Sequence, residues 1–198
     1  MWDVRGSMTA LVTPFCNGEV DWARMDALVD RQIEGGTDRL VPCGTTGESP
    51  TLTKTEHEKL VEAVIARSAG RCPVMAGTGS NDTAEAVRRT RHAASAGADA
   101  VLIVVPYYNR PSPQGLFRHY SKIAASVDIP IVLYNVPARC GVNLSNDTVV
   151  SLREAHPNIV ALKHATGSVD GVTDLRGRSD IAILSGDDQL TWPMMALG

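Results

Sequence analysis

A lysine closes the apolar run Ile159-Val160-Ala161-Leu162-Lys163, which has the length and composition of a buried β-strand. In parallel α/β sheets and barrels, the chemistry is done at the carboxyl ends of the strands, where Lys163 would lie. An amine in such a partly desolvated position has a lowered pKa and can attack a carbonyl group to form a Schiff base. On this run alone, a lysine that extends its ammonium group into water is the simpler interpretation.

Two further strand ends carry small and hydroxyl-bearing residues. In the segment GTTGE, flanking glycines allow the hydroxyl groups and backbone amides of Thr45 and Thr46 to bind a carboxylate, although a tight turn explains the same residues equally well. In the segment SGDD, Gly186 leaves room for a ligand. Asp187 and Asp188 are better explained as a helix N-cap than as a metal site, because the sequence offers no third ligand.

Two other strand ends carry tyrosine. In YNVPAR, the phenol of Tyr134 could transfer protons, and Arg139, five residues later, could bind a carboxylate bidentately. In PYYNRP, Tyr107 and Tyr108 stand between prolines, where adjacent tyrosines usually serve packing or an interface. Several predicted strand ends therefore carry residues of the types that catalysis and substrate binding require.

Seven short apolar runs alternate with stretches of helical periodicity, which is the pattern of repeated βα units. Helix starts are marked by Asp21, by the capping box of Thr53 and Glu56, and by Asp82. Such units in succession predict a parallel sheet with helices packed against it. The predicted strands are residues 8–13, 39–43, 73–77, 100–105, 129–134, 159–163 and 181–185.

The expected fold class is α/β, in the form of a (β/α)₈ TIM barrel. Apolar runs such as residues 101–105 are typical of strands buried on both faces, and the first strand lacks the glycine-rich turn of a dinucleotide-binding sheet. A closed barrel needs eight strands and about 250 residues. We therefore expect one barrel domain over residues 1–198, truncated after the seventh strand and incomplete at the C-terminus, with strands 1 and 7 left as unpaired edges.

The composition is that of an ordinary globular protein, with 43% hydrophobic and 21% charged residues. A formal net charge of -3 gives no bulk attraction to nucleic acid or to an anionic membrane, and small molecules are the expected partners. The N-terminus lacks the features of a secretory signal, so a cytoplasmic location is expected. The four cysteines are widely spaced, which predicts reduced thiols and neither disulfides nor a metal site.

Taken in order, the motifs GTTGE, PYYNRP, YNVPAR, ALKHATG and LSGDD resemble those of the pyruvate-dependent Schiff-base lyases and aldolases, the N-acetylneuraminate lyase family. The resemblance covers essentially the whole chain. It implies that Lys163 forms an imine with pyruvate, that Tyr134 transfers protons, and that Thr46 hydrogen-bonds to Tyr134. It also implies that Tyr108 is inserted from a neighbouring subunit, which makes a homodimer the minimum active unit and a homotetramer the expected assembly.

The same resemblance implies that Thr45 and Thr46 hold the carboxylate of pyruvate and that Gly186 contacts substrate. Paired threonines and Arg139 favour the branch that condenses pyruvate with L-aspartate 4-semialdehyde in lysine and diaminopimelate biosynthesis, with Arg139 binding the carboxylate of the semialdehyde. No metal or organic cofactor is implied. The lysine must be desolvated and kept away from a carboxylate partner, and His164 should point away from the barrel interior.

Two alternatives stay open. One is another aldolase of the family, acting on sialic acid or on a keto-deoxy sugar acid. The other is a catalytically inactive truncated homologue, because loss of a strand would expose apolar surface and weaken the domain.

Overall fold

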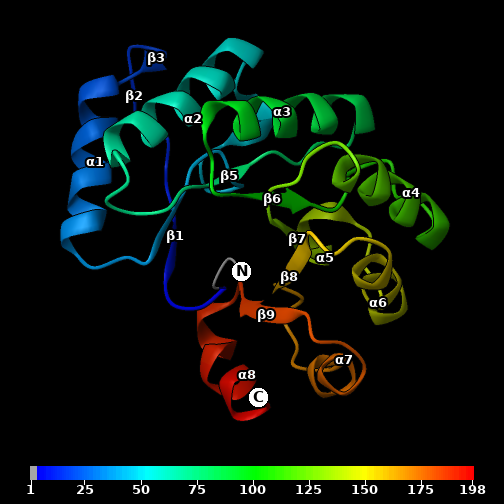
Figure 1. Cartoon of the computed structure of the whole chain (residues 1–198). Coiled ribbons are helices and arrows are strands. Elements are labelled where there is room, and N and C mark those ends of the chain that lie inside the picture. The colour runs from blue at the N-terminus through cyan, green and yellow to red at the C-terminus, as the bar shows by residue number, and fades with distance from the viewer. Residues whose placement is uncertain (1–3) are drawn as a thin grey trace. The chain divides into compact units, whose positions relative to one another are not determined.

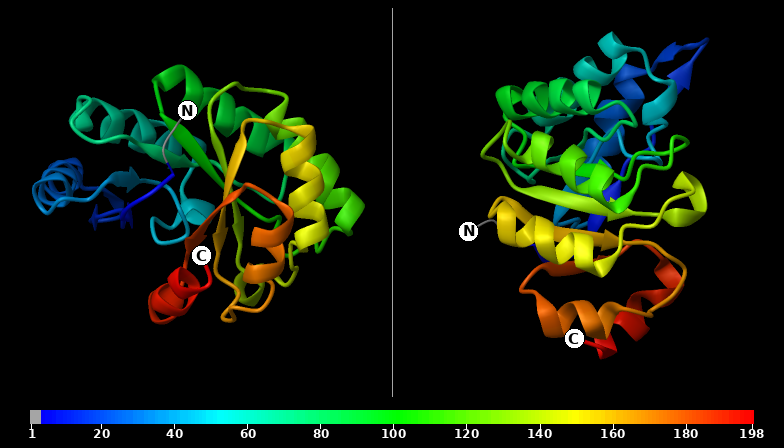
Figure 2. Two further views of the ribbon diagram at one scale, coloured as in Figure 1. Left: turned by 60° about the horizontal axis from the view of Figure 1, so that its bottom comes forward. Right: turned by 90° about the vertical axis from the view of Figure 1, so that its right-hand side faces the viewer.

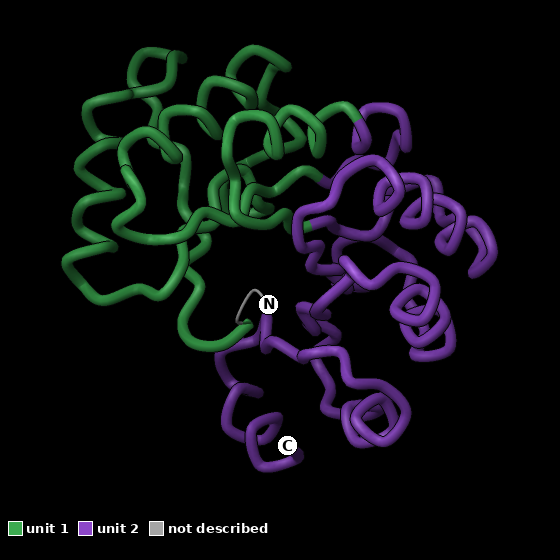
Figure 3. The backbone as a smooth tube through the Cα atoms, in the orientation of Figure 1, with its two compact units in different colours: residues 1–78, 88–102 green, residues 79–87, 103–198 purple. Residues whose placement is uncertain are grey.

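Strands and helices alternate along the chain in the computed structural model, which describes residues 4–198 (Figure 1, Figure 2). Met1, Trp2 and Asp3, the first residues of the N-terminus predicted to lack a secretory signal, lie outside the described residues. The chain forms two compact units, one of residues 4–78 and 88–102 and the other of residues 79–87 and 103–198 (Figure 3).

The strands of the first unit pair in parallel. Strand β1 (Met8–Ala10) pairs with β4 (Arg39–Val41), and an isolated bridge from Leu40 to Val74 joins β4 to the chain just before β5 (Met75–Gly77). Strand β5 pairs in turn with the first three residues of β6 (Ala100–Val104). Strands β4 and β5 are buried throughout, as the near-continuous apolar runs predict.

The helices of this unit begin where the sequence signals predict. Helix α1 (Trp22–Glu34) is capped by Asp21, whose carboxylate accepts the N–H of Arg24 at 3.0 Å. Helix α2 (Lys54–Ser68) follows the short 3₁₀ helix η1 (Ser49–Thr51) and starts with the complete capping box of Thr53 and Glu56. Helix α3 (Thr83–Ala96) runs from the second unit into the first.

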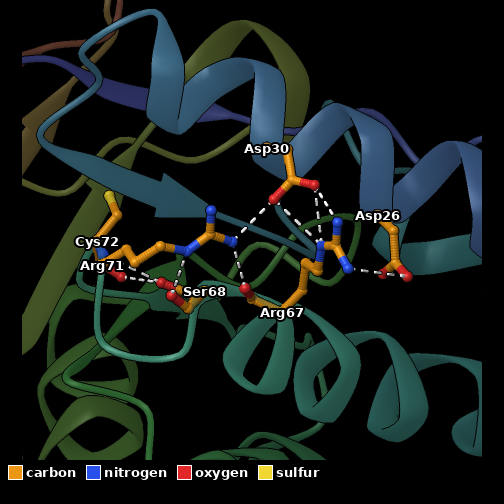
Figure 4. A network of polar contacts seen from close by, with 6 residues as sticks. All are labelled: Asp26, Asp30, Arg67, Ser68, Arg71 and Cys72. Atoms are coloured by element: carbon orange, nitrogen blue, oxygen red, sulfur yellow. Dashed lines mark hydrogen bonds and ion pairs between the residues drawn. The ribbon is translucent and has the colours of Figure 1, made fainter.

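An ion network joins α1 to α2 (Figure 4). Asp30 on α1 accepts hydrogen bonds from Arg67 and, at 2.8 Å, from Arg71, and Arg67 also lies 4.0 Å from Asp26. The hydrogen bond from Arg67 and then that from Arg71 lower the pKa of Asp30 to about 2. The network couples the two helices through charged groups at the surface.

A small antiparallel hairpin of β2 (Phe15–Cys16) and β3 (Glu19–Val20) precedes α1 and is absent from the sequence prediction. Asn17 and Gly18, at its tip, both have positive φ, at 52° and 84°. Asn-Gly is the preferred pair for a two-residue hairpin turn of this kind, so the signal was present in the sequence.

The second unit is built on three parallel strands, in the order β7 (Ile131–Asn135), β8 (Ile159–His164) and β9 (Ala182–Ser185). The N–H of Val105, at the end of β6, donates to the carbonyl of Tyr134 on β7 at 3.0 Å. Helices α4 (Pro113–Ala124), α6 (Asn146–Ala155) and α7 (Val172–Arg178) succeed one another on one side of these strands (Figure 2).

Three short helical segments complete this unit. They are α5 (Pro137–Cys140), the 3₁₀ helix η2 (Asp188–Leu190) and α8 (Thr191–Ala196). All seven predicted strands are confirmed, with ends that differ by at most three residues. The four cysteines are unpaired, as predicted. Within residues 4–198, every helix falls short of the length and apolar character that crossing a membrane requires.

Candidate active site

The central pair of the candidate site is Lys163 on β8 and Tyr134 on β7. The two residues are register partners in the parallel ladder, so their side chains project from the same face of the sheet. The Nζ atom of Lys163 lies 4.5 Å from the centroid of the Tyr134 ring. Tyr134 is buried and Lys163 is half-buried, which places the amine in a partly desolvated position beside a phenol.

Burial lowers the pKa of Lys163, while the negative charges of Asp187 and then Asp188 act in the opposite direction. The two carboxylates therefore act on the amine through their charge, and the expectation that Lys163 has no close carboxylate partner stays a prediction. Burial remains the larger effect. The net change favours the neutral amine, which is the form that attacks a carbonyl group.

Gly186 lies directly against the end of β8. Its N–H donates to the carbonyl of His164 at 2.8 Å. A Cβ atom added at Gly186 would lie 2.6 Å from Cβ of Ala165 and 3.1 Å from Cε of Lys163. Only a residue without a side chain can pack here with the lysine in its present position.

The two aspartates after Gly186 do not act as the predicted helix cap. Asp187 is the N-cap residue of η2 but its side chain makes no capping hydrogen bond, and α8 starts without a side-chain cap at Leu190. The carboxylate of Asp187 instead accepts the N–H of Gly167, in the loop after β8, at 3.1 Å. Sequence reasoning missed this contact because it joins residues 20 positions apart.

Thr45 and Thr46 lie in the first unit, in the turn that follows β4, and both are exposed. The turn is fixed by backbone hydrogen bonds from Gly47 and Ser49 to the carbonyl of Gly44, at 3.1 and 3.4 Å. A Cβ atom at Gly47 would lie 3.0 Å from the carbonyl oxygen of Leu11, so this glycine allows a close approach of two backbone segments. The tight turn that the sequence allowed is present, and the binding of a carboxylate by Thr45 and Thr46 stays a prediction.

Tyr108 and Arg139 are both exposed members of the second unit. Tyr108 is 90% exposed and has a φ of 72°, which is strained for a tyrosine. Its N–H donates to the carbonyl of Cys140 at 3.4 Å, which ties the tyrosine loop to the end of α5. Arg139 lies within the short helix α5, which begins at Pro137.

His164 follows Lys163 and therefore lies on the opposite face of β8. It is buried, and burial lowers its pKa. Together with Asn135 and residues of α6 and α7, it lines a cavity of about 560 Å³. This placement agrees with the expected packing role away from the catalytic face.

Across residues 4–198, no three His, Cys, Asp or Glu side chains are grouped so that they could hold a metal ion. Within the second unit, the structure brings together Lys163, Tyr134 and Gly186. Thr45 and Thr46 belong to the other unit.

Comparison with known proteins gives consistent matches over almost the whole chain. The sequence model of the dihydrodipicolinate synthetase family matches residues 3–198. The 4-hydroxy-tetrahydrodipicolinate synthase of Aquifex aeolicus (strain VF5) is 50% identical over 196 residues, which cover 98% of this chain and 67% of the relative. The chain thus spans about two thirds of the length of the curated relatives that it matches.

Solved structures of the same family are also similar to this chain. The 4-hydroxy-tetrahydrodipicolinate synthase from Methylacidiphilum fumariolicum SolV superposes with a TM-score of 0.97 at 50% identity, over 99% of this chain and 66% of that one. The chloride-inhibited dihydrodipicolinate synthase from Acinetobacter baumannii, complexed with pyruvate, superposes with a TM-score of 0.95 at 47% identity, over 99% of this chain and 68% of that one. These likenesses confirm the predicted fold class, the (β/α)₈ barrel.

Proposed function

Because the chain belongs to the dihydrodipicolinate synthetase family, we propose that it condenses pyruvate with L-aspartate 4-semialdehyde through an imine on Lys163. The product is 4-hydroxy-tetrahydrodipicolinate, which serves lysine and diaminopimelate biosynthesis. The observation that carries this proposal is the half-buried amine of Lys163, 4.5 Å from the ring of Tyr134 at the carboxyl end of a parallel strand.

Imine formation starts with the neutral amine of Lys163. Its nitrogen attacks the keto carbon of pyruvate, and the resulting carbinolamine loses water to give the imine. The protonated imine makes the pyruvate methyl group acidic, and loss of one proton gives an enamine. The enamine carbon attacks the aldehyde carbon of the semialdehyde, whose oxygen takes up a proton. Release of the cyclic product by the amino group of the second substrate returns Lys163 to the free amine.

Each of these steps moves a proton, and we assign that transfer to Tyr134. Its phenol lies on the strand next to Lys163 and on the same face. A tyrosine can donate and accept in turn when a hydroxyl chain connects it to solvent. We assign Thr46 and Tyr108 to that series of hydroxyl groups, as the family resemblance implies. The exposed, strained Tyr108 suits insertion into a second copy of the protein.

Substrate binding is assigned to the remaining strand ends. Thr45 and Thr46 would hold the carboxylate of pyruvate with hydroxyl groups and backbone amides. The exposed Arg139 would bind the carboxylate of the semialdehyde, and Gly186 would leave space beside the reacting amine. A homodimer as the minimum active unit, a homotetramer as the assembly and a cytoplasmic location belong to the same proposal.

Arg139→Ala tests whether Arg139 serves the binding of the semialdehyde and not the reaction with pyruvate. With pyruvate alone, the variant should form the Lys163 imine at a rate close to that of the unchanged protein. With the semialdehyde added, its kcat/KM should fall by about a hundredfold or more, because a bidentate charged contact is lost. Equal loss in both assays would contradict the assignment. Turnover of another aldehyde acceptor in preference to the semialdehyde would indicate a different aldolase of the family.

A further inference from the structure

The loop that follows Lys163 is held by a residue of a different loop. Residues 165–171 connect β8 to α7. Within this loop, Oγ1 of Thr166 donates to the carbonyl of Ser168 and accepts its N–H, and Oγ of Ser168 accepts the N–H of Asp170. Gly167, at the tip of this turn, has a φ of 76° and donates its N–H to Oδ2 of Asp187 at 3.1 Å. In the described structure, this is the bond that anchors the turn to the segment after β9.

Asp187 is itself fixed in place by its neighbours. Its backbone carbonyl accepts hydrogen bonds from Oγ of Ser185 at 2.8 Å and from Oγ1 of Thr191 at 3.2 Å, and its N–H donates to Oγ of Ser185 at 3.3 Å. A backbone held at these points directs the carboxylate toward Gly167. The backbone of Asp187 is therefore held on one side of the contact, and the bond to the N–H of Gly167 orients its carboxylate.

The residue before Asp187 packs on the reacting lysine. Gly186 donates its N–H to the carbonyl of His164, and its Cα faces Cε of Lys163 closely enough that an added Cβ would approach it to 3.1 Å. Both loops therefore lie next to the lysine, the first because it continues the strand of Lys163 and the second because Gly186 packs on Cε of Lys163. Any relative movement of the loops changes the space around the amine.

We propose that Asp187 is a positioning residue whose carboxylate, by accepting the N–H of Gly167, ties the loop after Lys163 to the loop after β9 and keeps Gly186 against the lysine side chain. Asp187 acts through Gly167 and Gly186 and need not touch substrate. The catalytic readout below rests on the proposed role of Lys163 in imine formation, whereas the exchange readout depends on the structure alone.

The carboxylate of Asp187 also acts on Lys163 through its negative charge. The test must separate this charge effect from the effect of the hydrogen bond to Gly167. The groups that act on Lys163 are the ring of Tyr134 on β7 and the carboxylates of Asp187 and Asp188 after β9. Asp188 supplies a matched control, because its charge also acts on Lys163 and it is the first residue of η2, next to Asp187. Loss of either charge lowers the pKa of Lys163, so the neutral amine becomes available at lower pH.

The experiment compares Asp187→Ala, Asp187→Asn and Asp188→Asn. Borohydride trapping of the pyruvate adduct is measured from pH 5 to pH 9, and hydrogen exchange is measured on the peptide that contains residues 165–171. Asp187→Asn removes the charge and keeps an oxygen that can accept from Gly167, whereas Asp187→Ala removes both. A misplaced amine should cost Asp187→Ala about ten- to a hundredfold in trapping rate at every pH.

For the two asparagine variants we expect mainly a shift of the pH dependence toward lower pH, with a smaller loss of rate than in Asp187→Ala. Residues 165–171 should exchange faster in Asp187→Ala than in either asparagine variant. The proposal is overturned if Asp187→Ala matches Asp188→Asn in both rate and exchange, since the carboxylate would then act through its charge alone.

Two controls keep the result decisive. If Asp187→Ala does not fold, hydrogen exchange at the Gly167 amide of the unchanged protein tests the proposal instead. A Gly167 amide that is not protected from exchange overturns the proposal, because its hydrogen bond to Asp187 would then not persist. If the unchanged protein forms no adduct, the proposed function fails, and the exchange comparison still tests the role of Asp187.

Discussion

Substitution of Gly186 by alanine adds a single methyl group at the point where the chain packs on Lys163. Built on the present backbone, the new Cβ lies 2.6 Å from Cβ of Ala165, 3.1 Å from Cε of Lys163 and 3.4 Å from the carbonyl oxygen of His164. The lysine side chain can rotate away from such a contact. Ala165 cannot, because its Cβ is fixed to the backbone of the strand end, so the backbone after β9 must move.

The cost follows from these distances. Overpacking of this kind destabilises a fold by about 1–3 kcal/mol. A displacement of the amine by about 1 Å can slow a reaction that depends on its position by about a hundredfold. Gly186→Ala should therefore lower the free energy of unfolding modestly and the rate of imine formation strongly.

The assay is borohydride trapping of the pyruvate adduct, with urea unfolding measured in parallel. Gly177→Ala is the matched control, because a Cβ at Gly177 in α7 meets no atom within 4 Å and alanine suits a helix better than glycine. We expect Gly177→Ala to leave trapping unchanged and to stabilise the protein slightly. A Gly186→Ala variant that traps pyruvate as fast as the unchanged protein would refute the packing argument.

Three further outcomes are expected. Tyr134→Phe keeps the ring beside Lys163 but loses the phenol, so the imine should still form while turnover falls by about 10²- to 10⁴-fold in a steady-state assay. The arginines of the ion network lower the pKa of Asp30 from its ordinary value of 3.8 to about 2. The network should therefore stabilise the fold above about pH 4 and lose that effect as the pH falls toward 2. In Asp30→Asn, this pH dependence should be absent from the unfolding curves. Thr53→Ala deletes the cap of α2 and should cost about 1 kcal/mol in urea unfolding.

The parts of the fold that could be predicted are those set by local sequence. Apolar runs identified the seven strands, and Asp21 and Thr53 marked two helix starts that the structure confirms with side-chain hydrogen bonds. The hairpin at Asn17 and Gly18 could have been predicted from the same kind of signal. One barrel domain over residues 1–198, incomplete at the C-terminus, stays a prediction.

The site was predictable to the extent that it follows strand ends. Lys163 and Tyr134 could be named from sequence because each closes a strand, and the parallel register then sets them side by side. The role of Asp187 could not be predicted, because a carboxylate after a strand fits a helix cap as well as a contact across loops. The close packing of Gly186 on Lys163 likewise depends on two strands brought together by folding.

The measurement that tests the central claim most directly is the site of pyruvate attachment. The protein is incubated with pyruvate and borohydride, digested, and mapped by mass spectrometry, with Lys163→Met as the control. The Schiff-base account predicts one reduced pyruvate adduct, on the peptide that contains Lys163, and none in the variant. A folded protein that gains no adduct, or gains it on another lysine, would contradict the account.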